Sequence, residues 1–367
     1  MYSVPVEEYP TLAALFEPLD YQLAPQAVLA NVVAGRVYAD RAQQPRSALI
    51  QVQHRCYLSG DPENGAFNAA LRRLFAEEIY PQALARGEEA FTLYFHEGWE
   101  TAITEQVLGG LDPIPSERAY YELSQQGEAR QAALPEDLQL VMVDRALTED
   151  HSLRNLEDLL EEMQSERESV EAFLARSFGV CLRAPDLLVT WCLSEYNLGA
   201  RCEVGIATHP DYRRRGLAAA TGLAFLEQAR ARAVTRVGWH CFADNLGSRA
   251  SAERLGGKLV HAYPSFLAFY ERPLHLAVRG NILLGQGAYR EAQEWFSRAE
   301  ATGSAPAWSY FAAACTAARL EEAGQAMRLL EQAVERGFRR RESFEQNENL
   351  TNLRATPEWQ ALLNRLS

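Results

Sequence analysis

The alternation of apolar and polar positions divides the chain into three regions, the first of which covers residues 1–137. Apolar runs typical of strands alternate there with segments whose apolar residues recur at helical spacing. The strand-like runs are SALIQVQHRCYL and EAFTLYFH, and the helical ones are FNAALRRLFAEEIYPQALARG and GWETAITEQVLGG. We expect a mixed α/β unit here, followed by a polar linker, QQGEARQAALPED.

The second region, residues 138–271, is predicted to be another α/β unit with the order β-α-β-β-β-α-β-α-β-β. In chain order its elements are LQLVMVDRAL, the long acidic helix LRNLEDLLEEMQSERESVEAFLARSF, GVCLRA, LLVTWCLSEY, RCEVGIAT, a helix to about Val234, RVGWHCF, NLGSRASAERLG, KLVHAY and FLAFYE. A hairpin around Pro185 and Asp186 joins the second and third strands. Because neighbouring antiparallel strands precede one β-α-β crossover, the sheet should be mixed and mostly antiparallel.

The third region, residues 272–367, is predicted to be all-helical and repetitive, with a closing helix at PEWQALLNRL. Matching small and large apolar positions recur 34 residues apart, which is the tetratricopeptide period. They are Ala292, Phe296 and Ala299 with Ala326, Leu330 and Ala333, and Leu276 and Gly280 with Tyr310 and Ala314. The second copy lacks the turn marked by Gly287 and Tyr289 in the first, so an unrelated helical hairpin is the alternative.

The composition is typical of a globular protein, with 47% hydrophobic and 23% charged residues among 367. The net charge of -13 argues against general nucleic-acid binding, which needs a basic surface. The sequence shows neither a signal-peptide pattern nor an apolar run of about 18 residues, so we expect a cytoplasmic protein without a membrane span. Six scattered cysteines, without CxxC motifs and without histidines at metal-ligand spacing, predict buried free thiols and no metal site.

The stretch HPDYRRRGLA connects the predicted strand EVGIAT to a predicted helix and concentrates three arginines at that junction. A helix begins with about four unpaired peptide N–H groups and a partial positive charge, which together attract anions. Gly216 and Ala218 keep side chains away from the backbone that an anion would approach. The loop is therefore predicted to bind a pyrophosphate, the alternative being a solvated arginine-rich turn.

The spacing Arg213-x-x-Gly216-x-Ala218 resembles the R/Q-x-x-G-x-G/A motif of the GNAT superfamily of N-acyltransferases. Asn245, which opens the helix after RVGWHCF, resembles the second motif of that superfamily. The resemblance covers residues 138–271 and implies a GNAT sheet flanked by helices. It also implies acetyl-CoA as the acyl donor.

A narrower resemblance extends into the first region, through NVVAGRVYAD, QPRSALI, YLSGDPENGAF and GWE. These stretches are similar to the GNAT acetyltransferase family that includes zwittermicin-resistance-type enzymes. That family places a degenerate GNAT-like half before the active half. Because nothing in residues 1–137 repeats the arginine loop, we expect this half not to bind the cofactor.

The resemblance also places the cofactor contacts. The backbone of Ile206, Ala207 and Thr208 should bond the pantetheine arm. The pyrophosphate loop and the start of its helix comprise Arg213, Arg214, Arg215, Gly216, Leu217, Ala218 and Ala219, with the peptide N–H groups from Arg214 onward as donors. Asn245 and Ser248 should line the channel, although a plain helix cap is an alternative role for Asn245.

Acyl transfer to an amine needs a general base, and the resemblance makes Glu203 the candidate, with a surface carboxylate as the alternative. By strand alternation Glu203 shares a face with Gly205 and Ala207, unless a bulge in this strand changes the facing. His240 is a second candidate base, but we expect it to point away from the site, beside Trp239.

The family's usual acid, a tyrosine seven residues after the asparagine, is absent here, because that position is Ala252. Tyr263 or Tyr270 could replace this tyrosine, or the leaving thiolate could take a proton from water. Each of these two tyrosines could also be a plain core or rim aromatic.

Two functions follow from these observations. The first is an acetyl-CoA-dependent N-acetyltransferase. In this reaction a small amine, of an antibiotic-like or amino-acid-derived kind, attacks the thioester directly in a ternary complex. The alternative is a non-catalytic acyl-CoA-binding scaffold whose tetratricopeptide-like tail recruits a protein partner. The tail could also mediate self-association or pack on the enzyme, because two repeats make only a short surface.

Overall fold

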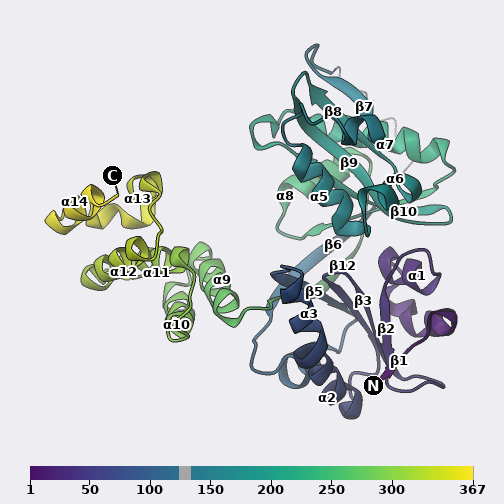
Figure 1. Cartoon of the computed structure of the whole chain (residues 1–367), viewed down its shortest axis with the longest axis horizontal. Helices are drawn as coiled ribbons and strands as arrows, with labels where there is room; N and C mark the ends of the chain where they lie inside the picture. Colours follow the sequence, from purple (N-terminus) through teal and green to yellow (C-terminus); the bar gives the residue numbers. More distant parts are fainter. Residues whose placement is uncertain (124–133, 367) are drawn as a thin grey trace. The chain divides into compact units, whose positions relative to one another are not determined.

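The structure is a computed structural model that describes residues 1–123 and 134–366 (Figure 1). It contains two compact units, one of residues 1–79 and 91–267, the other of residues 80–90 and 268 to the C-terminus. The predicted linker lies mostly outside the described residues. The predicted boundary of the helical region, at residue 272, lies close to the start of the second unit's long segment.

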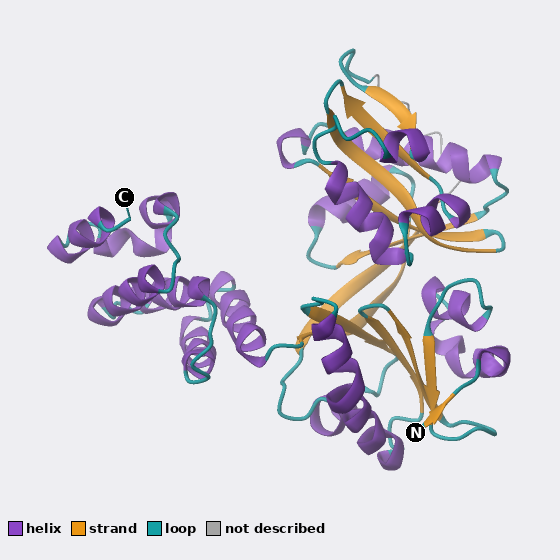
Figure 2. Cartoon of the chain, in the orientation of Figure 1, coloured by secondary structure: helices purple, strands orange, loops and turns teal. Residues whose placement is uncertain are grey.

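The first unit is built on one mixed sheet, which has twelve strands in the described part of the chain (Figure 2). Their spatial order is β1-β2-β3-β4-β5-β12-β6-β11-β10-β9-β8-β7. The strands are β1 (Tyr2–Ser3), β2 (Arg36–Ala39), β3 (Ser47–Val52), β4 (Arg55–Gly60), β5 (Ala90–Phe95), β6 (Ile114–Leu123), β7 (Gln139–Met142), β8 (Gly179–Ala184), β9 (Leu187–Leu198), β10 (Arg201–Thr208), β11 (Arg236–Phe242) and β12 (Lys258–Phe269).

Helical segments flank this sheet, which confirms the predicted fold class. They are the 3₁₀ segments η1 (Val6–Leu19) and η4 (Pro210–Tyr212), the π-helical segments η2 (Phe75–Ile79) and η3 (Ala102–Val107), and α1 (Leu23–Leu29), α2 (Gly65–Leu74), α4 (Arg145–Thr148), α5 (Leu156–Glu166), α6 (Val170–Arg176), α7 (Leu217–Ala231) and α8 (Leu246–Arg254). Two parallel strand pairs, β4 with β5 and β10 with β11, are each connected through a helix, α2 and α7 respectively. The predicted hairpin of β8 and β9 is present.

The middle of the sheet joins the first two predicted regions. Strand β6, from the first region, lies between β11 and β12 of the second, and β12 in turn lies beside β5. The division of the chain at residue 137 stays a prediction, but both segments contribute strands to one compact unit. This interleaving brings residues of the first region next to β10 and β11.

Three elements of the second region differ from the prediction. The long acidic helix is two helices, α5 and α6, because Ser169 accepts a hydrogen bond from Ala172 N at 3.1 Å and starts α6 anew. The last strand pair is the single strand β12, since pairing with β6 continues through Pro264. The end of the first predicted strand is instead α4, which Asp144 caps at Leu147 N.

The two faces of the second region's sheet pack against different helices. On one face Val204, Val237 and Trp239 pack beneath α7 and α8. On the other face Trp191 and Leu193 pack against α5 and α6. The N-terminal segments η1 and α1 cover the same face of the sheet as α5 and α6. They pack there over a cluster that includes Tyr120, Tyr196 and Tyr263.

The second unit is helical, as predicted, and pairs α9 with α10 and α11 with α12. Its helices are α3 (Tyr80–Ala85), α9 (Arg272–Gly285), α10 (Tyr289–Glu300), α11 (Ala307–Arg319), α12 (Ala323–Glu335), α13 (Arg341–Gln346), the 3₁₀ segment η5 (Glu348–Leu353) and α14 (Pro357–Asn364). All ten positions that match at the 34-residue spacing are buried. Glu321, at φ 63°, takes the left-handed conformation that Gly287 has in the first copy, so the turn recurs without glycine. The tetratricopeptide assignment itself stays a prediction.

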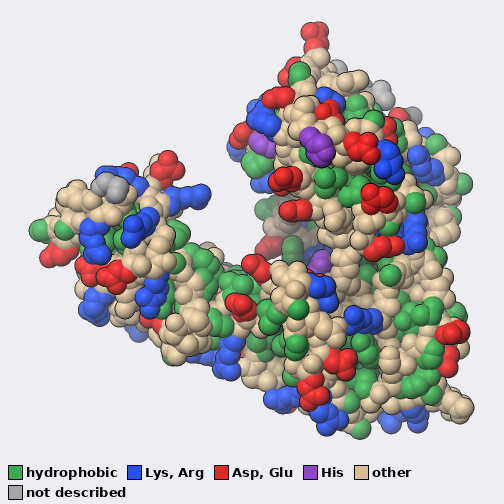
Figure 3. Space-filling view, in the orientation of Figure 1, with side chains coloured by type: hydrophobic (Ala, Val, Ile, Leu, Met, Phe, Trp, Pro, Cys, Tyr) green, Lys and Arg blue, Asp and Glu red, His purple; other side chains and the backbone are tan. Residues whose placement is uncertain are grey.

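The surface and the cysteines bear on the kind of protein. On the face shown in Figure 3, acidic and basic side chains are interspersed rather than gathered into one basic patch. All six cysteines are buried and none is in a disulfide. Among the described residues, no helix is long and apolar enough to cross a membrane, and no His, Cys, Asp and Glu group could hold a metal.

Candidate functional site

Strands β10 and β11 are paired only along their first halves. Their parallel pairing runs from Arg201 with Arg236 to Val204 with Trp239. Beyond that point β10 continues along β9 to Thr208, while β11 continues along β6. A strand paired on one side directs half of its peptide groups away from its partner. The predicted pantetheine-binding residues of β10 therefore border the opening between the two strands.

The arginine loop leads from this opening to the start of α7. Arg214 and Gly216 both have left-handed backbone conformations, with φ of 61° and 79°, and α7 begins at the next residue, Leu217. Among the described residues, no side chain caps this helix start. Its first peptide N–H groups are thus available to an anion.

The arginines of the loop hold its shape. Arg213 Nε donates to the carbonyl of Thr208 at 3.2 Å, and Arg215 Nη2 donates to the carbonyl of Asp211 at 2.8 Å. A further arginine comes from α8: Arg254 Nη1 would lie 3.7 Å from a Cβ at Gly216. Arg254 was not among the predicted site residues, because only the packing of α8 against α7 places it near Gly216.

Asn245 caps α8, as one of its two predicted roles requires. Its Oδ1 accepts a hydrogen bond from Ser248 N at 3.0 Å. The Ser248 hydroxyl accepts a hydrogen bond from Trp239 Nε1, also at 3.0 Å. Their predicted part in lining a cofactor channel stays a prediction.

Glu203 is buried rather than at the surface, with 5% of the residue exposed. Its Oε1 accepts from the peptide N–H of Leu23 at 2.5 Å and contacts His240 Nε2 at 3.1 Å. His240 Nδ1 lies 2.8 Å from the Tyr263 hydroxyl. We expected His240 to point away from the site, but it faces Glu203. The reason is the strand register: Gly238 is the partner of Glu203, and His240 lies two residues further along, on the same face.

A bulge is present, but in β9 rather than in β10. Glu203 is opposite Tyr196 and Val204 is opposite Ser194, which leaves Glu195 as the extra residue. The alternation of β10 is kept. An ideal Cβ at Gly205 would lie 2.3 Å from Glu195 Oε1 and 2.8 Å from Glu162 Oε1, so both carboxylates gather over this glycine.

An open pocket of about 500 Å³ lies beside these carboxylates. Asp158, Glu161 and Glu162 of α5 line it, together with Trp191, and it extends to Arg213. Trp191 Nε1 donates to Glu162 Oε2 at 2.7 Å. These three acids of α5 were not predicted to belong to a site, since helical periodicity alone makes them ordinary solvent-facing acids.

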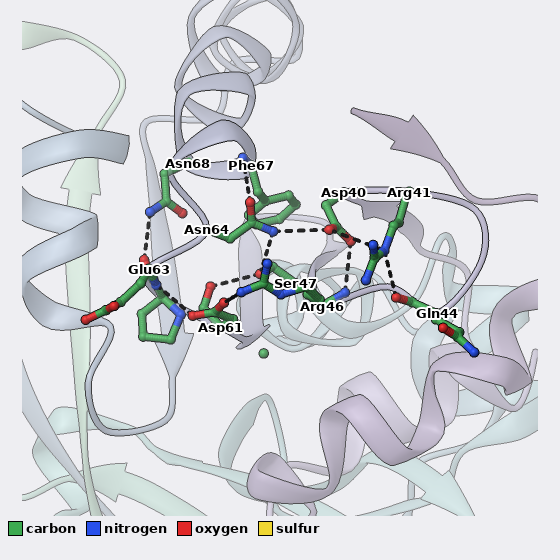
Figure 4. Close-up of polar contacts among 12 residues, drawn as sticks. Asp40, Arg41, Gln44, Arg46, Ser47, Asp61, Glu63, Asn64, Phe67 and Asn68 are labelled. Atoms are coloured by element: carbon green, nitrogen blue, oxygen red, sulfur yellow. Dashed lines mark hydrogen bonds and ion pairs between the residues drawn. The ribbon is translucent and has the colours of Figure 1, made fainter.

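The corresponding helix start in the first region has the opposite chemistry (Figure 4). Between β4 and α2, Asn64 Oδ1 accepts from Phe67 N at 3.3 Å and so caps the helix internally. Asp61 forms an ion pair with Arg46, and Asp40 Oδ2 accepts from Asn64 Nδ2 at 3.1 Å. An anion here would meet two carboxylates and an occupied helix start, which disfavours its binding.

The remaining acid candidates lie in different places. Ala252, at the position of the family's tyrosine, is fully buried and has no hydroxyl group. Tyr263 is buried in the network with His240. Tyr270 belongs to the second unit, where its ring packs edge-on against that of Tyr80 at 5.3 Å.

Replacing Gly238 by valine should destabilise the protein by about 1–3 kcal/mol, because the site has no room for a side chain. A Cβ there would lie 2.9 Å from Tyr120 Cε2 and 3.1 Å from Glu203 Cγ. Urea unfolding would measure the loss. Gly65→Ala is the control, because nothing lies within 4 Å of its Cβ position, and it should change stability by less than about 0.5 kcal/mol. Equal midpoints for both variants would contradict this packing.

Comparison with known proteins agrees with the geometry. A model of the family described as GNAT acetyltransferase matches residues 13–266. The chain is 24% identical over 259 residues to the uncharacterized N-acetyltransferase YdfB of Bacillus subtilis (strain 168), covering 70% of this chain and 94% of that protein. A GCN5-related N-acetyltransferase-like protein from Streptococcus suis 89/1591 has a similar fold, with a TM-score of 0.53 and 23% identity. That match covers 72% of this chain and 100% of the other.

Proposed function

This chain belongs to the GNAT acetyltransferase family, and on that premise we propose that it transfers the acetyl group of acetyl-CoA to a small amine. Two connected features carry the proposal. The start of α7 has no side-chain cap, and β10, which leads to it through the arginine loop, is no longer paired with β11 beyond Val204. Such a site offers peptide N–H groups for a pyrophosphate and a strand edge for an extended arm.

The residues present fit acetyl-CoA. The peptide N–H groups from Arg214 to Ala219 would receive the pyrophosphate, with the Arg254 guanidinium close by. The open edge of β10 at Ile206, Ala207 and Thr208 would bind the pantetheine arm. Bound acetyl-CoA supplies the thioester that the amine attacks.

The acceptor amine would enter from the acidic pocket, which Ala207 lines, and move along the face of β10 that also carries Gly205 and Glu203. Amines are largely protonated near neutral pH, and the carboxylates of α5 would attract the ammonium form. Glu203 takes a proton from nitrogen, so that the neutral amine attacks. The new N–C bond forms as the C–S bond breaks, and the second proton of the amine leaves to solvent water, which supplies a proton to the thiolate.

We propose that the leaving thiolate takes its proton from water. Position 252 carries no hydroxyl group, and the hydroxyl of Tyr263 is already bonded to His240. Tyr270 stays a candidate acid by prediction only. A non-catalytic scaffold gains no support, because the matched family is one of acetyltransferases, and a partner for the helical tail also stays a prediction.

Two measurements test the proposal in order. Acetyl-CoA at about 100 times its dissociation constant should stabilise the protein against thermal unfolding by roughly 2.7 kcal/mol. Thiol release should then depend on an added amine, in a panel that varies the number of positive charges. An unchanged unfolding transition would contradict the cofactor site, and binding without amine-dependent thiol release would contradict the transferase.

A further inference from the structure

Three polar side chains on adjacent parts of the sheet form one buried hydrogen-bonded chain. Glu203 comes from β10, His240 from β11 and Tyr263 from β12, with β6 between the last two strands. The contacts are 3.1 Å from Glu203 Oε1 to His240 Nε2 and 2.8 Å from His240 Nδ1 to the Tyr263 hydroxyl. The side chains of Glu203 and His240 are only 7% and 12% exposed, so water competes little for these bonds.

The direction of the hydrogen bonds follows from Tyr263. Burial raises the pKa of its hydroxyl well above the usual value, although Arg118 opposes that effect, so the hydroxyl keeps its proton. The hydroxyl can therefore donate to His240 Nδ1, which lies 2.8 Å away. At the other end the Glu203 carboxylate can only accept, so its 3.1 Å contact requires a donor at His240 Nε2. His240 Nδ1 is then the acceptor, and the imidazole proton resides on Nε2, facing Glu203.

The imidazole ring is also fixed sterically. The Tyr120 ring stacks on it with centroids 4.7 Å apart and an angle of 23°. Gly238, one position away on the same face, has no side chain that could separate the imidazole from Glu203. The ring is therefore held both by its edge atoms and by its face.

Both donors to Glu203 meet the same oxygen. The His240 N–H and the peptide N–H of Leu23 point to Oε1, and among the described residues no hydrogen bond is made to Oε2. The carboxylate is thereby oriented with one oxygen engaged and the other left for an acceptor's proton. Leu23 belongs to the first region, so the segment that lacks a cofactor loop still contributes to this group.

We propose that His240, oriented by Tyr263, is the positioning residue that aims the Glu203 carboxylate at the acceptor amine. This role rests on the proposed transferase function, in which Glu203 is the base. His240 need not exchange a proton with the substrate. It acts by supplying one fixed N–H donor, so what matters is the donor and not the charge.

The kinetic test compares His240→Phe with His240→Gln in the full-length protein. The glutamine amide can place an N–H donor near the position of Nε2, whereas phenylalanine cannot. His240→Phe should lower kcat by about 10²-fold with the KM for acetyl-CoA within about twofold of wild type, because a misplaced base costs roughly that much. His240→Gln should recover most of the loss. Equal losses in both variants, or none in either, would overturn the proposal.

A second measurement does not depend on turnover. Nitrogen-15 NMR of histidine-labelled protein distinguishes protonated from unprotonated ring nitrogens, and the His240→Gln spectrum identifies the His240 signals. We expect a protonated Nε2 and a Nδ1 signal that shifts in Tyr263→Phe but not in the control Tyr310→Phe, whose buried tyrosine lies in the second unit. A proton on Nδ1 in the wild-type protein would overturn the proposal. If the spectra agree with it while no amine is acetylated, the proposed function fails and the bonding network stands.

Discussion

Replacing Glu203 by glutamine is expected to lower kcat by about 10²- to 10⁴-fold, the range that a positioned general base contributes. The amide has nearly the shape of the carboxylate but cannot take up the amine proton. Acetyl-CoA binding should be unchanged, since the loop from Arg213 to Ala219 does not contact this side chain in the described structure. Steady-state kinetics and the thermal shift with acetyl-CoA measure the two effects separately.

The matched control for this variant is Glu149→Gln. Glu149 is an exposed carboxylate that pairs with Arg145 at 3.3 Å on α4. The Glu149→Gln substitution should leave kcat within about twofold of the wild-type value, because exposed ion pairs contribute little to stability. If Glu203→Gln retains kcat within threefold of wild type, Glu203 is not the base, and the two carboxylates beside Gly205, Glu162 and Glu195, become the groups to test.

Replacing Gly216 by valine should weaken acetyl-CoA binding by at least about tenfold, equivalent to about 1.4 kcal/mol. The glycine has φ 79°, and an L-residue in that region costs about 1–2 kcal/mol, more when it is β-branched. Space is not the obstacle, since only Arg254 Nη1, at 3.7 Å, lies near the Cβ position. The backbone would relax and turn the first N–H groups of α7 away from the pyrophosphate. Isothermal titration with acetyl-CoA measures the change.

Gly287→Val separates backbone strain from the loss of the site. Gly287 has φ 78°, and its Cβ position is 3.9 Å from the nearest atom, but it lies in the second unit. Gly287→Val should lower the free energy of unfolding by about as much as Gly216→Val does, and it should leave the affinity for acetyl-CoA unchanged. Equal affinities in Gly216→Val and Gly287→Val would contradict a pyrophosphate site at the arginine loop.

Local features of the fold could be predicted from the sequence, because they depend on residues close together in the chain. The strand, loop and helix around Arg213 and Gly216 follow from periodicity and from the conformational freedom of glycine. The hairpin at Pro185 and the 34-residue repeat of the helical region follow in the same way. Predictions failed where a local signal was ambiguous, as at Pro264, where pairing with β6 continues the strand.

The candidate base could be named from the sequence, but its surroundings could not. The contact of Glu203 with Leu23 joins residues 180 positions apart, and that with His240 joins residues 37 apart. The bulge that turns Glu195 toward Gly205 arises from a register shift between two strands, which no single strand's pattern records. Arg254 reaches Gly216 only through the packing of α8 on α7.

The sequence by itself thus determined most of the elements, the arginine loop and the family resemblance, since each depends on spacing along the chain. Only the tertiary structure decided that β6 and β12 interleave the two regions and that His240 faces Glu203. It also placed three acids of α5 along one open pocket. The physical reason is that hydrogen bonds and charges act through space over a few ångströms, and which distant residues come that close is settled by strand order and register.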